Sequence, residues 1–171
     1  AERHFLMPAL DRWVLRKVLA ELSKQSNQTL QFSVNLSGST ISEESLLEEI
    51  TDLIDTSGVC PKRLCFEITE TSAIANLPVA LKLMGGLRQR GCEFSLDDFG
   101  TGMSSLTYLR QLPVDYVKID GKFVRGILDD SVDQAIVQAV FDVTSKLGIR
   151  TVAEHVESKQ MLARLAHIGI D

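Results

Sequence analysis

The chain has 171 residues, of which 44% are hydrophobic, and its formal net charge is −5. This length supports one packed domain and is too short for two of ordinary size. Acidic residues spread along the chain exclude a basic surface of the kind that binds a nucleic-acid polymer. The chain shows no signal peptide and no apolar run near the ~18 residues of a membrane span. We therefore expect a cytoplasmic location, although other domains could anchor the parent protein to a membrane.

The spacing of apolar residues predicts a first helix and then repeated strand–helix units. The first helix covers residues 7–23, and its apolar stripe consists of Leu10, Trp13, Val14, Val18 and Leu22. The second helix is expected to start at Ser42 as its N-cap and to end near Gly58. Strands are expected at 31–37, 64–69, 93–97, 115–120 and 149–154. Further helices are expected at 79–90, after the glycine-rich loop near 100, at 131–147 and at 158–167.

Regular alternation of strands and helices predicts a parallel sheet with helical crossovers. An open doubly wound sheet and a (β/α)8 barrel both meet this description. Residues 35–38 lack the glycine fingerprint that normally follows the first strand of an open nucleotide-binding sheet. Polar residues near the C-terminal ends of the expected strands favour the barrel, where catalytic groups gather at that rim. Because a complete barrel needs ~250 residues, we predict an α/β, TIM-like (β/α)8 barrel represented by about five to six strand–helix units.

Five polar residues lie near the ends of five different expected strands. They are Asn35, Glu67, Asp97, Lys118 and Glu154. In the first four strands the polar residue alternates with apolar neighbours, which places it on the face that points into the barrel. Glu154 breaks this alternation, so we expect it just beyond the end of its strand.

Carboxylate and amide oxygens at one rim indicate a metal site, because the acids would otherwise repel each other. Hard oxygen donors suit Mg²⁺ or Mn²⁺ better than zinc. The adjacent pair Asp97 and Asp98 indicates two ions, with one carboxylate bridging them. Lys118 in the same mouth could orient a water molecule or offset negative charge on a phosphorane. The alternative is that each acid caps a helix or forms a surface salt bridge.

Residues 98–105 form a glycine-rich loop with several hydrogen-bond donors. Gly100 and Gly102 allow positive φ, and the hydroxyl groups of Thr101, Ser104 and Ser105 precede a helix N-terminus. This combination predicts substrate contacts, and its alternative is a tight strand-to-helix turn. The Asp-Phe-Gly triplet also occurs in protein kinases, but the other kinase motifs are missing.

Taken in order, five motifs resemble the EAL family of cyclic di-GMP phosphodiesterases. They are Val34-Asn35-Leu36-Ser37, Phe66-Glu67-Ile68-Thr69-Glu70, residues 96–102 around Asp97-Asp98, Val117-Lys118-Ile119-Asp120-Gly121, and Val152-Ala153-Glu154-His155-Val156-Glu157. The resemblance extends over nearly the whole chain, so we expect residues 1–171 to be a partial EAL phosphodiesterase domain.

The resemblance implies hydrolysis of cyclic di-GMP to the linear dinucleotide pGpG with two Mg²⁺ or Mn²⁺ ions. Asn35, Glu67 and Asp97 would hold the first ion, and Asp97 with Asp98 the second. Lys118 and Glu154 would position or activate the attacking water. Two further residues would support the site: Glu70 would brace the loop after Asp98, and Glu157 would be a supporting carboxylate.

The chain departs from the family pattern at both ends. The namesake Glu-Ala-Leu strand, whose glutamate is a metal ligand, should precede Ala1, and a Gln-Gly-Tyr stretch should follow Asp171. Truncation explains both, and we expect the 171-residue chain alone to hydrolyse cyclic di-GMP poorly and to associate through exposed strand edges. His155 stands where family members often carry glycine or an aromatic residue.

Three readings of function compete. The first is an active hydrolase whose parent protein carries sensory or GGDEF-type domains and forms a homodimer. The second is a catalytically inactive cyclic di-GMP receptor, which intact ligand motifs disfavour. The third is enolase-like proton abstraction by acids and a lysine on successive strands, which the ordered set of family motifs excludes.

Overall fold

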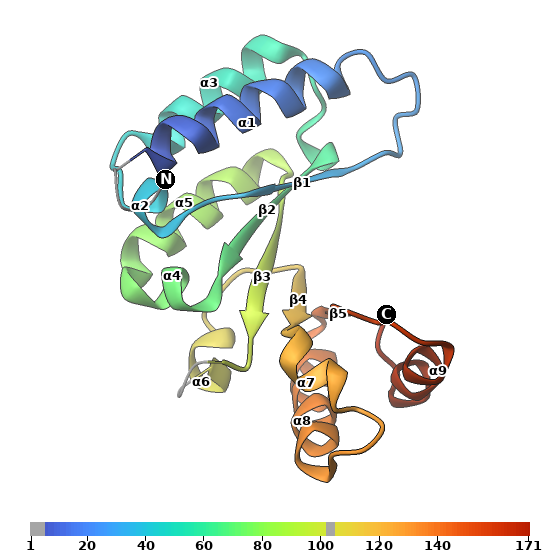
Figure 1. The fold of residues 1–171 in the computed structure, drawn as a ribbon. Coiled ribbons are helices and arrows are strands. Elements are labelled where there is room, and N and C mark those ends of the chain that lie inside the picture. The colour runs from blue at the N-terminus through green and yellow to red at the C-terminus, as the bar shows by residue number, and fades with distance from the viewer. Residues whose placement is uncertain (1–5, 102–104) are drawn as a thin grey trace. The chain divides into compact units, whose positions relative to one another are not determined.

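The computed structural model describes residues 6–101 and 105–171, and it describes the backbone alone for Ser105 and Leu106. The chain divides into two compact units, Ala1–Phe94 and Ser95–Asp171. Each unit consists of parallel strands joined by helices (Figure 1). The predicted alternation of strands and helices is therefore confirmed in both.

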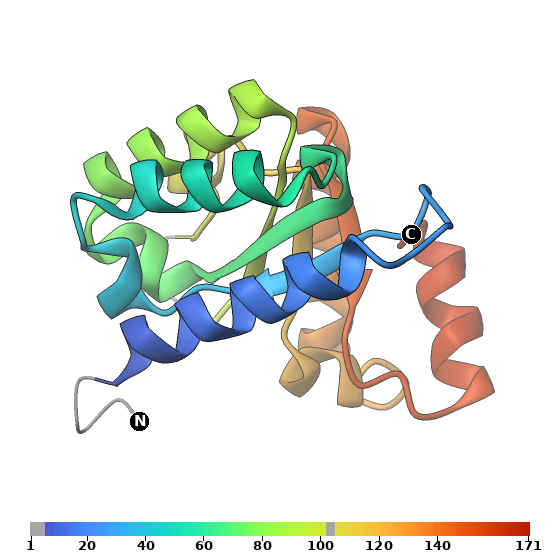
Figure 2. The same cartoon turned by 90° about the horizontal axis from the view of Figure 1, so that it is seen from above.

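The first unit contains two parallel strands and the helices that pack on them. Its strands are β1 (Phe32–Asn35) and β2 (Leu64–Thr69). Its helices are α1 (Met7–Leu22), α2 (Gly38–Ile41), α3 (Leu46–Ser57), α4 (Glu70–Ala75), α5 (Leu77–Arg90) and the 3₁₀ turn η2 (Pro61–Arg63). Helix α1 packs along β1 (Figure 1). Helix α3 lies between α1 and α5 (Figure 2).

Helix α1 buries only part of the predicted stripe, since Leu22 is buried and Val14 and Val18 are half-buried. Its buried side chains are Asp11, Leu15, Leu19 and Leu22. Leu10 and Trp13 were expected in the core, but they are 43% and 56% exposed. The prediction was wrong here because α1 has apolar residues on more than one side. The buried side includes the Asp11 carboxylate, which accepts hydrogen bonds from Ser37 N–H and the Thr40 hydroxyl.

Helix α3 starts later than predicted. Ser42 was expected to cap it, but Ser42 follows the short helix α2, and α3 begins at Leu46 after Ser45. The reason is that Ser37 caps α2, so residues 38–41 form a helical turn of their own. The predicted end of α3 at Gly58 is confirmed, and Gly58 adopts the left-handed conformation that ends many helices.

The second unit has most of one strand, two further strands and four helices in its described residues; the first two residues of β3 belong to the first unit. The strands are β3 (Glu93–Phe99), β4 (Tyr116–Ile119) and β5 (Arg150–Ala153). The helices are α6 (Ser105–Leu109), α7 (Gly121–Arg125), α8 (Ser131–Leu147) and α9 (Lys159–Ile168). The pairs β3–β4 and β4–β5 are parallel. Helix α8 packs on β4, β5 and α7, and it has the predicted bounds (Figure 1).

The strands place apolar and polar side chains on opposite faces. Val34, Phe66, Ile68, Val117 and Ile119 are at most 1% exposed. The polar residues that alternate with them therefore project from the other face of the strands. Among the described helices, none combines the length and apolar composition needed to cross a lipid bilayer.

Candidate active site

Three predicted site residues meet at the C-terminal ends of the strands in the second unit. Asp97 lies in β3, Lys118 in β4, and Glu154 directly after β5. The Glu154 amide still donates to the Ile119 carbonyl at 3.3 Å, so the strand pairing fixes its backbone. This confirms the expectation that Glu154 lies just past its strand, where side-chain alternation no longer determines its direction.

The Lys118 ammonium lies between two carboxylates. Its Nζ is 3.0 Å from Asp97 Oδ1 and 2.7 Å from Glu154 Oε1. The lysine and aspartate side chains are each 16% exposed and the glutamate 26%, so water screens these ion pairs only partly. The single ammonium partly offsets the charge of the two carboxylates, and the two ion pairs hold the lysine amine at the rim.

Asp98 adds a third carboxylate through an irregularity in β3. Adjacent residues of a regular strand point to opposite faces. Here the register of β3 against β4 shifts between Leu96 and Phe99, and Asp98 has a φ of +55°. Aspartate tolerates this left-handed conformation better than most residues. Asp98 N–H donates to Asp97 Oδ1 at 3.1 Å, which links the two neighbouring acids.

The site raises the pKa of the Asp98 carboxyl above its ordinary value. Partial desolvation is the largest cause, and three nearby carboxylates add to it, whereas the Lys118 ammonium acts in the opposite direction. The three carboxylates are Asp97, Asp120 and Glu154. This local excess of negative charge would be relieved by a bound cation.

The donor set of the second unit fits a divalent cation. One carboxylate oxygen from each of Asp97, Asp98 and Glu154 lies within 4.8 Å of the others. All three are hard oxygen donors, which Mg²⁺, Mn²⁺ and Ca²⁺ prefer to thiolate or imidazole. Asp97 and Asp98 of the predicted metal site therefore lie together, and Glu154, predicted to act on water, lies with them.

The first unit places Asn35 and Glu67 side by side. The two residues are register partners at the C-terminal ends of β1 and β2. The next backbone hydrogen bond runs from Leu36 N–H to the Glu67 carbonyl at 2.8 Å. Their use as metal ligands together with the acids of the second unit stays a prediction.

A short capped helix follows three of these site residues. In each case the residue two positions later is the N-cap, and its side chain accepts a backbone N–H of the helix. The pairs of site residue and cap are Asn35 with Ser37 before α2, Glu67 with Thr69 before α4, and Lys118 with Asp120 before α7. Sequence analysis missed these caps and helices. The signal was a Ser, Thr or Asp at each strand exit, but helices of four to six residues are too short for apolar periodicity to reveal.

The other predicted residues take varied positions. Thr101 Oγ1 donates to the Asp98 carbonyl at 3.0 Å and so stabilises the turn after β3. Ser104 and the side chain of Ser105 lie outside the described part of the chain. Glu70 is the first residue of α4 and is 1% exposed, whereas Glu157 is exposed between β5 and α9. Their supporting roles stay predictions.

His155 follows Glu154 and packs closely on Gly121. A Cβ atom on Gly121 would lie 2.1 Å from His155 Cδ2, so only glycine fits beneath this ring. His155 itself has a φ of +54°, a conformation that glycine adopts most readily. The structure thus explains why glycine can occupy position 155 and what the histidine contacts instead.

Comparisons with known proteins agree on one family. The family model described as EAL domain matches residues 1–171. Cyclic di-GMP phosphodiesterase PdeB of Shewanella oneidensis is 44% identical over 173 aligned residues, which cover 100% of this chain and 20% of that protein. Cyclic di-GMP phosphodiesterase NbdA of Pseudomonas aeruginosa is 37% identical, with 96% of this chain and 22% of that protein covered.

Solved structures show the same fold. The PaMucR phosphodiesterase in complex with c-di-GMP matches with a TM-score of 0.93 and 30% identity, covering 100% of this chain and 70% of that one. The FimX EAL domain from Pseudomonas aeruginosa bound to c-di-GMP matches with a TM-score of 0.91 and 26% identity, covering 99% and 69%. These matches confirm the TIM-like α/β fold of the EAL type. The chain spans about a fifth of the length of the two curated relatives.

Proposed function

Because the chain belongs to the EAL domain family, we propose that it is part of a phosphodiesterase that hydrolyses cyclic di-GMP to pGpG. The observation that carries the proposal is the position of the Lys118 ammonium between Asp97 and Glu154. Asp98 lies in the same acidic cluster. The names of the two curated relatives point to the same substrate and reaction.

The proposed roles follow from the donor set. Asn35, Glu67 and Asp97 would hold one cation, and Asp97 with Asp98 would hold a second. Two Mg²⁺ or Mn²⁺ ions, when bound, would supply charge neutralisation at the phosphodiester and acidify water for the attack. The all-oxygen ligands support this choice of metals over zinc.

Lys118 and Glu154 would act on the attacking water. The ammonium can donate a hydrogen bond to a water oxygen while its contacts with Asp97 and Glu154 hold it in place. The Glu154 carboxylate can accept the proton that the water releases, because a carboxylate within hydrogen-bond reach acts as a general base. Thr101, Ser104 and Ser105 are the proposed substrate-contacting residues of the loop after β3.

The organisation of the parent protein is also part of the proposal. Residues 1–171 would be one partial EAL domain of a longer chain, because the matched relatives are about five times longer. We further propose that the parent protein carries sensory or GGDEF-type domains, forms a homodimer and is cytoplasmic.

The test is product formation by the complete protein that contains this chain. Linear pGpG should form with Mg²⁺ or Mn²⁺ and should be absent with excess chelator. Asp97→Asn should abolish turnover, because this carboxylate is assigned to both ions. Asp129→Asn is the matched control, because Asp129 is exposed and lies outside the acidic cluster. Turnover by Asp97→Asn would refute the metal assignment, and binding of cyclic di-GMP by the wild type without hydrolysis would indicate a receptor.

A further inference from the structure

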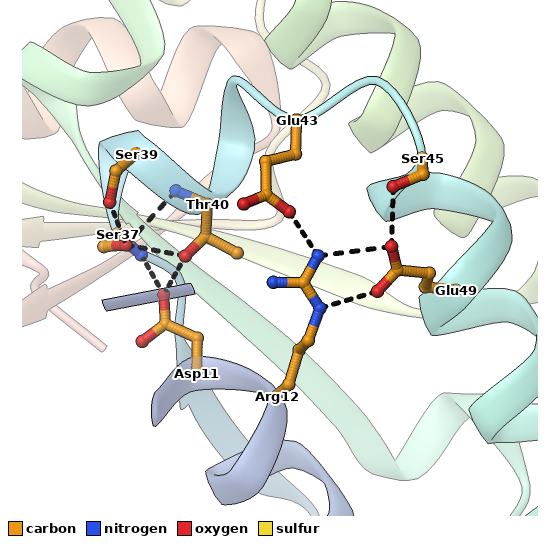
Figure 3. Close-up of polar contacts among 8 residues, drawn as sticks. All are labelled: Asp11, Arg12, Ser37, Ser39, Thr40, Glu43, Ser45 and Glu49. Atoms are coloured by element: carbon orange, nitrogen blue, oxygen red, sulfur yellow. Dashed lines mark hydrogen bonds and ion pairs between the residues drawn. The ribbon is translucent and has the colours of Figure 1, made fainter. Parts of the chain in front are cut away.

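Helix α1 carries a buried carboxylate whose hydrogen bonds reach the exit of β1. Asp11 is 6% exposed. Its Oδ2 accepts the backbone N–H of Ser37 at 2.9 Å and the hydroxyl of Thr40 at 2.6 Å (Figure 3). A carboxylate is costly to bury, and hydrogen bonds of this kind offset the cost. The Asp11 carboxylate and the segment from Ser37 to Thr40 therefore fix each other's position.

That segment immediately follows Asn35. The Leu36 N–H is bound to the Glu67 carbonyl of β2 at 2.8 Å, and the next N–H, of Ser37, is bound to Asp11 of α1. Two consecutive peptide groups after the candidate ligand are thus held by two different elements. This limits rotation of the backbone that carries the Asn35 side chain.

The contact does more than cap a helix. Ser37 itself caps α2, because its Oγ accepts the Thr40 N–H at 3.3 Å and lies 2.7 Å from Thr40 Oγ1. Asp11 therefore adds a bond to the strand exit that α2 does not need for its own cap. Groups that orient metal ligands without touching the metal typically change metal affinity by about 10–100-fold when they are removed.

We propose that Asp11 is a positioning residue of the metal site, which orients Asn35 through the backbone at Ser37. This inference rests on the proposed function, in which Asn35 is a ligand. Its neighbour Arg12 provides the contrast. Arg12 is on the same helix, but it pairs with Glu43 and, at 2.6 Å, with Glu49, both of which lie beyond α2 (Figure 3).

The experiment compares Asp11→Ala, Asp11→Asn and the matched control Arg12→Gln in the complete protein. One readout is hydrogen exchange at the Ser37 amide, which reports directly on the proposed contact. The second is the Mn²⁺ dissociation constant without substrate, measured by the electron paramagnetic resonance of free Mn²⁺. Thermal unfolding of each variant in chelator records the general loss of stability.

We expect Asp11→Ala to accelerate exchange at Ser37 and to weaken Mn²⁺ binding about tenfold. Asp11→Asn should recover part of the affinity, because its amide oxygen can accept the same bonds. Arg12→Gln should lower the unfolding temperature but leave Mn²⁺ affinity within about twofold. If Asp11→Ala does not fold, Thr40→Val removes one of the two bonds and should weaken Mn²⁺ binding in the same direction.

Unchanged Mn²⁺ affinity in Asp11→Ala, despite faster exchange at Ser37, would overturn the positioning role. An equal loss of affinity in Arg12→Gln would also overturn it, since it would show that any weakening of α1 suffices. If the wild-type protein binds no Mn²⁺, the proposed function fails and the role of Asp11 fails with it. The first two outcomes leave the proposed function standing, so the two failures are distinguishable.

Discussion

Replacing Lys118 with alanine should destabilise the metal-free protein in a way that divalent cations reverse. The ammonium is 3.0 Å from Asp97 Oδ1 and 2.7 Å from Glu154 Oε1, and Asp98 lies in the same cluster. Without this cation, three carboxylates face each other with oxygens within 4.8 Å. A bound divalent ion would supply the missing positive charge.

The expected magnitude follows from these distances. At an effective dielectric constant near 20, two unit charges about 4–5 Å apart interact by about 3–4 kcal/mol. Partial exposure and protonation of one acid reduce this, so we expect a net loss of about 2–3 kcal/mol in chelator. For a domain of this size the loss corresponds to a fall in unfolding temperature of about 5–10 °C.

Thermal unfolding in chelator and in excess Mn²⁺ measures the effect. Lys118→Ala should unfold well below the wild type in chelator and close to it in Mn²⁺. The control is Lys146→Ala, because Lys146 is an exposed lysine in the last turn of α8. In kinetic assays kcat should fall by about 10²-fold or more, with substrate affinity within about tenfold of the wild type.

Two results would refute this reasoning. Equal unfolding temperatures in chelator would show that the lysine does not offset the acids. An unchanged kcat with a large loss of substrate affinity would reassign Lys118 to substrate binding.

Further predictions concern stability and thiol reactivity. The hydrogen bond from Arg12 lowers the pKa of Glu49 from 4.5 to about 2, so this pair stabilises the fold above about pH 4.5 and loses its effect as the pH falls towards 2. Glu49→Gln should therefore flatten the acid limb of a pH–stability curve. Arg63 is 5% exposed and donates to the carbonyls of residues 22, 27 and 30. Arg63→Met leaves these acceptors without their donors and should cost about 3–5 kcal/mol in chemical denaturation. Burial raises the pKa of the Cys92 thiol to about 12, whereas Cys60 is exposed. Peptide mapping after brief alkylation of the native protein should find Cys60 modified and Cys92 protected.

The strands and long helices could be predicted because their signals are local. Helix α8 has the predicted bounds, since Asp130 caps its start and Gly148 ends it in the left-handed conformation. Strand β2 also matches, because Leu64, Phe66 and Ile68 alternate with polar or smaller residues. In such elements a few neighbouring residues determine both ends.

Features that depend on tertiary contacts could not be predicted. Hydrophobicity places Leu10 and Trp13 of α1 in the core, but the buried side contains Asp11, whose partners are 26 and 29 residues away. No local pattern reveals that these partners exist. Apolar spacing along the helix therefore predicted Leu10 and Trp13 as core residues and did not detect the buried Asp11.

The candidate site also combines features that local sequence patterns predict with features that depend on tertiary contacts. Alternation along the strands predicted that Asp97 and Lys118 project from the same face, and the 3.0 Å ion pair between them agrees with this. Asp98 joins Asp97 in the cluster because β3 has a register shift and Asp98 has a positive φ. Neither feature can be predicted from the presence of two adjacent aspartates. The ion pair from Lys118 to Glu154 joins β4 to the residue after β5, so it required the strand register.

The capped turns after Asn35, Glu67 and Lys118 have a consequence for how such a site can assemble during folding. Each cap bonds to an amide only two or three residues further along the chain, so its geometry forms without distant partners. The turn that follows each strand is therefore favoured by a segment of fewer than about ten residues, and such local contacts form early because they close only short loops. At the exit of β1 the bond from Ser37 N–H to Asp11 then adds a distant contact. When the strands pair, each capped turn is already formed, and pairing brings the turns to their final distances from one another. A single insertion between a site residue and its cap should thus disturb one side chain and leave the folding of its neighbours unaffected.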